Sequence, residues 1–219
     1  MDLFAALSEL FLHLDEHLIN VVETYGALTY VILFVIIFME TGIVVTPFLP
    51  GDSLIFVAGA LAAIDRSPLN IAILFGVLLT AAILGDTVNY WIGHRVGPMA
   101  FDGKIRVLNQ RHLEKTQQFY ERHGGKTIVL ARFIPIVRTF APFVAGVGAM
   151  HYNRFIAFNV VGAFLWTGLF TFAGYFFGNI PVVEKNFELV IVAIVFLSVV
   201  PIAAEYVRGR LMRPSVKPI

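Results

Sequence analysis

Long apolar stretches alternate with short polar breaks along most of the chain. Three of them, 69–93, 154–178 and 187–207, each have at least the roughly 20 residues that a helix needs to cross a bilayer. They predict three transmembrane helices. Before them, residues 3–22 mix Leu and Phe with acids and histidines at helical spacing. This pattern is typical of an amphipathic helix lying on the membrane surface.

A fourth apolar stretch, 25–46, is long enough to span a membrane but contains Glu40. It leads into the turn-forming sequence Pro50–Gly51–Asp52, and the apolar residues 54–64 that follow are too few to cross. The pattern indicates a broken, re-entrant segment with Pro50, Gly51 and Asp52 at the break. A carboxyl group at this depth can carry a proton near neutral pH, which makes Glu40 and Asp52 candidates for proton coupling. Asp52 could equally cap a helix that begins near Leu54.

The fifth apolar stretch, 126–150, contains two arginines, Arg132 and Arg138, and two prolines, Pro135 and Pro142. A charge at bilayer depth costs about 2.5–3.5 kcal/mol, and a proline removes a backbone hydrogen bond that only protein or water can replace. The stretch therefore predicts a second broken, re-entrant segment that lines a polar cavity. Guanidinium groups in such a cavity suit phosphate or carboxylate, which they can bind bidentately.

Each of these polar residues also has a simpler interpretation. Arg132 lies near the start of its stretch and could extend to the membrane surface, and Glu40 could serve only as a structural partner for an arginine. Asp86 and Asn89 share one face of the 69–93 helix, where they line the same cavity or bond a neighbouring helix. The two tryptophans, Trp91 and Trp166, are interpreted as interface anchors or packing residues.

A repeat organises the chain into two halves, about 24–93 and 123–178, within one membrane domain that covers residues 1–219. The string VAGALA at 57–62 matches VAGVGA at 144–149. The string NYWIG at 89–93 matches GYFFG at 174–178. Broken segments at corresponding positions of two halves are typical of a transporter with its binding site near the middle of the membrane. The sequence thus predicts an all-α membrane protein with two re-entrant hairpins in an inverted repeat.

Charge gives the expected orientation. The chain is 58% hydrophobic with a mean hydropathy of +0.80, and no Lys or Arg precedes Arg66. Basic residues then crowd positions 95–126 and 208–217. The positive-inside rule places the loop 94–122 and the C-terminus in the cytoplasm, and three crossings then put the N-terminus outside.

The chain shows no pattern of an enzyme. It has no cysteine, its six histidines have no metal-ligand spacing, and it contains no nucleophile elbow, phosphate-binding loop or zinc-protease motif. We therefore expect no catalytic residue, no metal, no cofactor and no nucleic-acid partner. The alternatives to a transporter that binds phosphate are a proton-coupled exporter of small cations or drugs, a membrane lipid phosphatase, and a chaperone-like role.

Two runs resemble a known family. FMETGIVVTPFLPGDSLIFVAGALA and LARFIPIVRTFAPFVAGVG, at 38–62 and 130–148, are similar to the motifs of the bacterial DedA family of inner-membrane proteins, which shares its fold with VTT-domain proteins. The resemblance implies opposed re-entrant hairpins and transport that depends on the proton motive force.

The family's important acids match Glu40 and Asp52, and its important arginines match Arg132 and Arg138. Some members are implicated in recycling undecaprenyl phosphate. The expected partners are therefore protons and a polyprenyl or phospholipid phosphate in the bacterial inner membrane. Whether the chain forms a homo-oligomer stays open.

Overall fold

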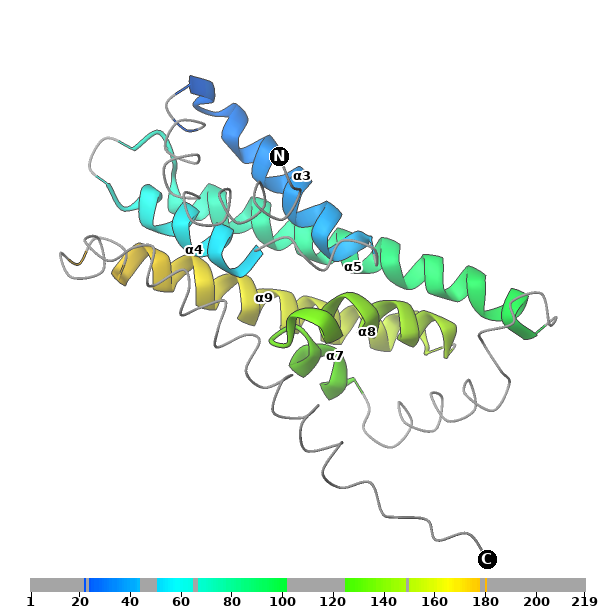
Figure 1. Cartoon of the computed structure of the whole chain (residues 1–219). Coiled ribbons are helices and arrows are strands. Elements are labelled where there is room, and N and C mark those ends of the chain that lie inside the picture. Colours follow the sequence, from blue (N-terminus) through cyan, green and yellow to red (C-terminus); the bar gives the residue numbers. More distant parts are fainter. Residues whose placement is uncertain are drawn as a thin grey trace, which may run out of the picture.

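The computed structural model describes residues 22, 24–43, 51–64, 67–101, 125–148, 150–177 and 180. All the regular structure in these ranges is helical, as expected (Figure 1). The N-terminal amphipathic helix, most of the loop 94–122 and the span 187–207 lie outside the described residues, as does Pro50. Those parts of the interpretation stay predictions.

In the part of the chain that the structure describes, each half contributes three helices. The first half has α3 (Leu28–Gly42), α4 (Gly51–Ala62) and α5 (Ile71–Phe101), and the second has α7 (Lys126–Ala131), α8 (Pro135–Val147) and α9 (Tyr152–Phe177).

Two of the described helices, α5 over Ile71–Gly97 and α9, are long and apolar enough to cross a membrane. They coincide with two of the three predicted spans in position, length and apolar composition. Helix α5 continues past residue 93, the expected end of the first span, into residues that were assigned to the loop.

The two prolines of the second broken stretch have different effects. Pro135 stands at the start of α8, where its missing N–H costs nothing, and the break between α7 and α8 covers residues 132–134. Pro142 lies inside α8, so the expectation that it breaks the segment is wrong. In the first half, α4 already begins at Gly51. Asp52 therefore lies within the first turn of α4, and the interpretation of Asp52 as a cap before Leu54 is also wrong.

The long helices α5 and α9 lie side by side and run in opposite directions (Figure 1). Near the start of α5, the ring of Phe75 meets that of Phe164 in the middle of α9, with 5.5 Å between centroids. Further along α5, Tyr90 stacks on Phe155 at the beginning of α9, at 4.4 Å.

Helix α4 packs on α9 and runs parallel to it. Asp52 near the start of α4 contacts Trp166, and Gly59 further along lies against the backbone of Thr171. A Cβ atom at Gly59 would collide with that backbone, and one at Gly174 would collide with the backbone of α4. The two helices therefore touch along their backbones, as small residues allow in membrane proteins.

Helix α8 packs on α5 in the same manner. Asn89 on α5 donates a hydrogen bond to the carbonyl oxygen of Thr139 near the start of α8. A Cβ atom at Gly146 would collide with the backbone of α5, and one at Gly93 with the backbone of α8. The second helix of each half, α4 or α8, thus packs on the long helix of the other half.

These contacts correct the register of the repeat. Gly59 and Gly146 occupy equivalent places, as the matching strings predict. Gly93, however, is equivalent to Gly174 and not to Gly178, with which the string match paired it. In the structure, the two aromatic-glycine strings are therefore shifted by one helical turn from the alignment that the sequence match gives.

The first helix of each half packs on its own long helix, α3 on α5 and α7 on α9. The Tyr30 hydroxyl accepts a hydrogen bond from the Asn70 N–H at 2.6 Å, and Gly125 lies against Phe158. Further along, Gly42 of α3 lies against Gly85 of α5, and Val129 of α7 lies against Gly162 of α9. Helix α3 therefore runs parallel to α5, and α7 runs parallel to α9. Because α4 is parallel to α9 and α8 to α5, α3 and α4 run in opposite directions, as do α7 and α8. We call these pairs the first hairpin and the second hairpin. The helices of one half all point opposite to their counterparts in the other half (Figure 1).

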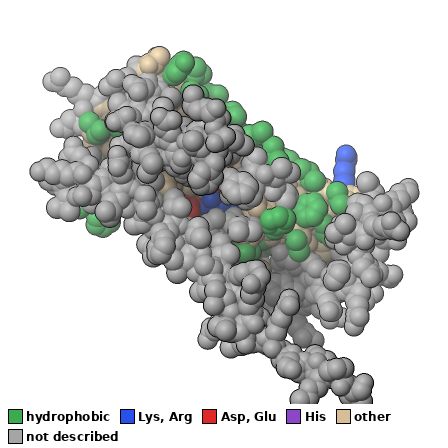
Figure 2. Space-filling model, viewed as in Figure 1, with side chains coloured by type: hydrophobic (Ala, Val, Ile, Leu, Met, Phe, Trp, Pro, Cys, Tyr) green, Lys and Arg blue, Asp and Glu red, His purple; other side chains and the backbone are tan. Residues whose placement is uncertain are grey.

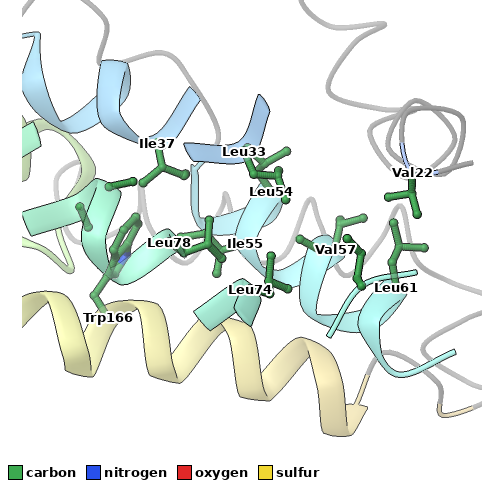
Figure 3. Packing of buried hydrophobic residues seen from close by; sticks show 14 of the residues in the cluster. Val22, Leu33, Ile37, Leu54, Ile55, Val57, Leu61, Leu74, Leu78 and Trp166 are labelled. Carbon is green, nitrogen blue, oxygen red and sulfur yellow. The ribbon is translucent and has the colours of Figure 1, made fainter. Parts of the chain in front are cut away.

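Apolar side chains hold the first hairpin against the long helices. Leu33 and Ile37 of α3, Ile55 of α4, and Leu74 and Leu78 of α5 are fully buried in one cluster (Figure 3). The outer faces of the long helices are also apolar, and their large exposed residues include Ile73, Leu84, Val88, Val160, Val161, Phe164, Leu165 and Leu169. Apolar side chains on both the inside and the outside are the arrangement of a protein surrounded by lipid.

Candidate functional site

The tips of the two hairpins meet near the middle of the long helices. Glu40 lies at the end of α3 and Asp52 in the first turn of α4, while Arg132 directly follows α7 and Arg138 lies in the first turns of α8. All four side chains are buried, with exposed fractions between 1% and 8%. Acidic and basic atoms are visible side by side at the centre of the face drawn in Figure 2.

Arg138 connects the two hairpins. Its guanidinium forms ion pairs with Glu40 through Nη2 and with Asp52 through Nη1. The two carboxyl groups come from the two helices of the first hairpin, so one arginine of the second hairpin binds both. Because all three groups are removed from water, their charges interact much more strongly than a surface pair would.

Arg132 is bound by the long helices. Its Nη2 donates to a carboxylate oxygen of Asp86 on α5 and to the side-chain oxygen of Asn159 on α9, each at 2.5 Å. It also lies 3.3 Å from the Ala82 carbonyl oxygen. Arg132 is only 2% exposed, so it does not extend to the membrane surface.

Trp166 of α9 lies close to both arginines. Its Nε1–H donates to Oδ1 of Asp52 at 2.8 Å. The centre of its ring is 5.0 Å from the guanidinium carbon of Arg138 and 5.9 Å from that of Arg132. The indole is fully buried, which excludes the role of interface anchor.

Asn89 joins the two hairpin tips through their backbones. Its side-chain amide nitrogen donates to the carbonyl oxygen of Thr41 at 3.2 Å and to that of Thr139 at 2.7 Å. Thr41 belongs to the end of α3 and Thr139 to the beginning of α8. One residue of α5 therefore contacts both tips.

The candidates from the sequence are thus close together in space. The tip residue Gly51 lies directly against the Glu40 carboxyl group, and Pro135 begins α8 near Arg138. Pro142 lies further along α8. The sequence argument missed two site residues, Trp166 and Asn159. For Asn159 a signal was present, because an amide in the middle of a predicted span has to find a polar partner.

The chain matches the model of the VTT domain over residues 49–176, which include α4, α5, α7 and α8 and all but the last residue of α9. The chain belongs to the DedA family of VTT-domain membrane proteins. The match covers three of the four ion-pairing residues at the tips, Asp52, Arg132 and Arg138, and extends over both long helices.

Relatives match over most of the chain. Protein DedA of Escherichia coli (strain K12) is 55% identical over 211 residues, which are 96% of this chain and 96% of that protein. An uncharacterized membrane protein of Mycobacterium tuberculosis is 42% identical over 190 residues, 85% of this chain and 83% of the relative. Inner membrane protein YghB of Escherichia coli (strain K12) is 32% identical over 201 residues, 91% and 84% of the two chains. No solved structure matches the chain.

Proposed function

We propose that this chain is a proton-coupled transporter that moves the phosphate headgroup of a lipid, such as undecaprenyl phosphate, across the bacterial inner membrane. The observation that carries this proposal is the pair of buried arginines at the meeting point of the hairpin tips. Guanidinium is the side chain best suited to bind phosphate, and a buried cation at this depth has to serve a purpose that offsets its cost.

The arginines retain donors for a ligand. Among the described residues, Nε of Arg132 and Nε of Arg138 are buried and have no hydrogen-bond partner. Buried donors in folded proteins almost always have a partner. Helices α4 and α8 also begin at this site, and the start of a helix favours a negative charge. These features together suit an anion.

The acids make the site dependent on protons. Three carboxyl groups, those of Glu40, Asp52 and Asp86, face the two guanidinium groups of Arg132 and Arg138. With every group ionised, the site would carry one excess negative charge, which a membrane interior disfavours. We infer that one of the three acids holds a proton in the empty site, and that an arriving phosphate favours uptake of another.

The arrangement of the halves provides a route for the headgroup. Two hairpins that point in opposite directions and meet at their tips can expose the same site alternately to either side. Lipid tails can remain in the bilayer because the outer faces of the helices are apolar. Small cations are poor ligands for a site with two buried arginines, which disfavours the drug-exporter alternative.

Transport by the purified protein in liposomes tests the proposal. The liposomes contain undecaprenyl phosphate, an imposed pH gradient, and an external phosphatase that reports headgroups reaching the outer leaflet. We expect transport that stops when an ionophore dissipates the gradient and that fails in Arg132→Ala and Arg138→Ala. Arg154→Ala, which removes an exposed arginine of α9, is the matched control. Wild-type transport by both site variants, folded in the membrane, would place the phosphate site elsewhere.

A further inference from the structure

Trp166 contacts more of the charged groups than a packing residue would. It touches Asp52 of α4 and the guanidinium groups of Arg132 and Arg138, so it contacts both hairpins from the middle of α9. Of the side chains that the structure describes, it is also the largest fully buried one, and it borders the apolar cluster of Figure 3.

The indole N–H binds Asp52 directly. Oδ1 of Asp52 accepts hydrogen bonds from both Trp166 Nε1 and Arg138 Nη1. Indole can only donate, so it favours a carboxylate oxygen as its acceptor over a protonated carboxyl group. An ordinary apolar side chain of similar size would fill the same volume without this preference.

The indole ring affects the arginines. Two guanidinium groups carry the same charge and repel each other, yet both lie within 6 Å of the ring centre, at 5.0 and 5.9 Å. The face of an aromatic ring attracts a cation, most strongly where water is excluded. The ring therefore helps to keep Arg132 and Arg138 on the same small region of the site.

We propose that Trp166 is the positioning residue of the phosphate site. Its N–H fixes the position of the Asp52 carboxyl group beside Arg138, and its ring holds both guanidinium groups where one headgroup can reach them. The inference rests on the proposed function, and it assigns the link between proton and phosphate to one side chain. Within the described ranges, the charged groups near Asp52 and Trp166 are Arg138 of α8 and Arg132 at the break between α7 and α8, which in turn pair with Glu40 of α3 and Asp86 of α5.

Two substitutions separate the N–H from the ring. Trp166→Phe keeps an aromatic ring and removes the N–H, so protonation of the site should become easier. We expect the midpoint of the pH dependence of transport to move to higher pH, by about one unit for the loss of a hydrogen bond to a charged group. Trp166→Leu removes the ring as well, and we expect it to weaken headgroup binding by about tenfold. A wild-type midpoint in Trp166→Phe together with wild-type binding in Trp166→Leu would reduce Trp166 to a packing residue.

Fluorescence gives a readout that needs neither transport nor a substitution of Trp166. The chain has two tryptophans, so Trp91→Phe, at an exposed position, leaves Trp166 as the sole reporter. In vesicles of phosphatidylcholine, its emission should change with pH, and the change should disappear when Asp52→Asn is added. Phosphatidic acid, a lipid with a free phosphate, should change it further. Emission that ignores pH in Trp91→Phe would overturn the inference even if both Trp166 variants misfold.

The same preparation distinguishes the two claims. If the wild-type protein transports no lipid phosphate but the emission of Trp166 follows pH through Asp52, the proposed function fails and the positioning role stands. If transport depends on protons while Trp166→Phe keeps the wild-type midpoint and the emission ignores pH, the positioning role fails and the function stands.

Discussion

Arg138 and Asp52 form an ion pair between the tips of the two hairpins, although 86 residues separate them in the sequence. Glu40 completes the arrangement from the other helix of the first hairpin. Removal of one partner would leave a buried charge without compensation, which costs about 3–5 kcal/mol. The pair therefore contributes to stability in the empty site, and a phosphate that binds Arg138 has to compete with it.

Replacement of Arg138 by lysine tests whether the site needs a guanidinium or only a positive charge. Lysine keeps the charge but cannot reach Glu40 and Asp52 with two separate nitrogens or bind a phosphate bidentately. We expect a folded protein whose transport falls by about 10- to 100-fold, from the loss of one charged hydrogen bond. The liposome assay measures the rate, and Arg154→Lys is the matched control. A rate near wild type would mean that a point charge suffices.

Gly51 gives a test of the Glu40 position that leaves all the charges in place. A Cβ atom at Gly51 would collide with the Glu40 carboxyl group, which has to swing away from Arg138. Gly51→Ala should therefore reduce transport without unfolding the protein. Gly76→Ala is the control: nothing lies near its Cβ, and alanine in a helix adds about 0.5–1 kcal/mol of stability. The measurements are the transport rate and the melting temperature of both variants. If Gly51→Ala transports as fast as Gly76→Ala, Glu40 does not need its present position.

Asn89 should matter because it binds both hairpin tips. Asn89→Leu removes the donors to the carbonyl oxygens of Thr41 and Thr139. We expect a loss of about 1–3 kcal/mol in stability, seen as a lower melting temperature, together with slower transport. Val88→Leu, at the neighbouring half-exposed position, should change neither. If Asn89→Leu melts like the wild type, the two hydrogen bonds do not hold the tips.

Much of this fold was predictable because membrane helices are defined by local properties. The uninterrupted spans needed only length and hydropathy, and the positions of the two breaks followed from Pro135 and Gly51. The effect of Pro142 was not predictable, because a helix can continue through a proline where neighbouring helices support it. The local sequence around Pro142 does not reveal whether neighbouring helices support the helix there.

The sequence predicted which charged residues form the candidate site, but it did not predict which of them pair with one another. Polar residues in apolar stretches are conspicuous, which brought attention to Glu40 and Arg138. Which acid pairs with which arginine depends on how the hairpins pack across the two halves, and Asp86 as the partner of Arg132 follows only from that packing. Trp166 was missed because its role depends on contacts with three other elements.

Orientation in the membrane is a separate prediction from the basic residues. Because the chain has no cysteine, single cysteines can be introduced at Ser8, Ser67, Gln110 and Ser215. An impermeant thiol reagent added to intact cells should label positions 8 and 67 and spare positions 110 and 215. Labelling of the opposite pair would reverse the orientation and with it the side from which each hairpin enters.

Proton coupling makes the final prediction. The three acids and the incoming phosphate compete for the same two guanidinium groups, so protonation of an acid and binding of phosphate should strengthen each other. Each proton that moves down a potential of about 100 mV supplies roughly 2.3 kcal/mol for the cycle. Glu40→Gln and Asp52→Asn imitate the protonated acids. We expect both variants to bind lipid phosphate while their transport loses its pH dependence.

The measurement compares headgroup binding and transport in the two variants over a range of about two pH units around neutrality. Asp86→Asn belongs in the same series, because it acts on Arg132 and leaves the groups around Arg138 intact. If only the acids of Arg138 carry the transported proton, Asp86→Asn should keep the pH dependence and change only the affinity for phosphate. Wild-type pH dependence in both Glu40→Gln and Asp52→Asn would leave these acids as structural partners and refute the coupling mechanism.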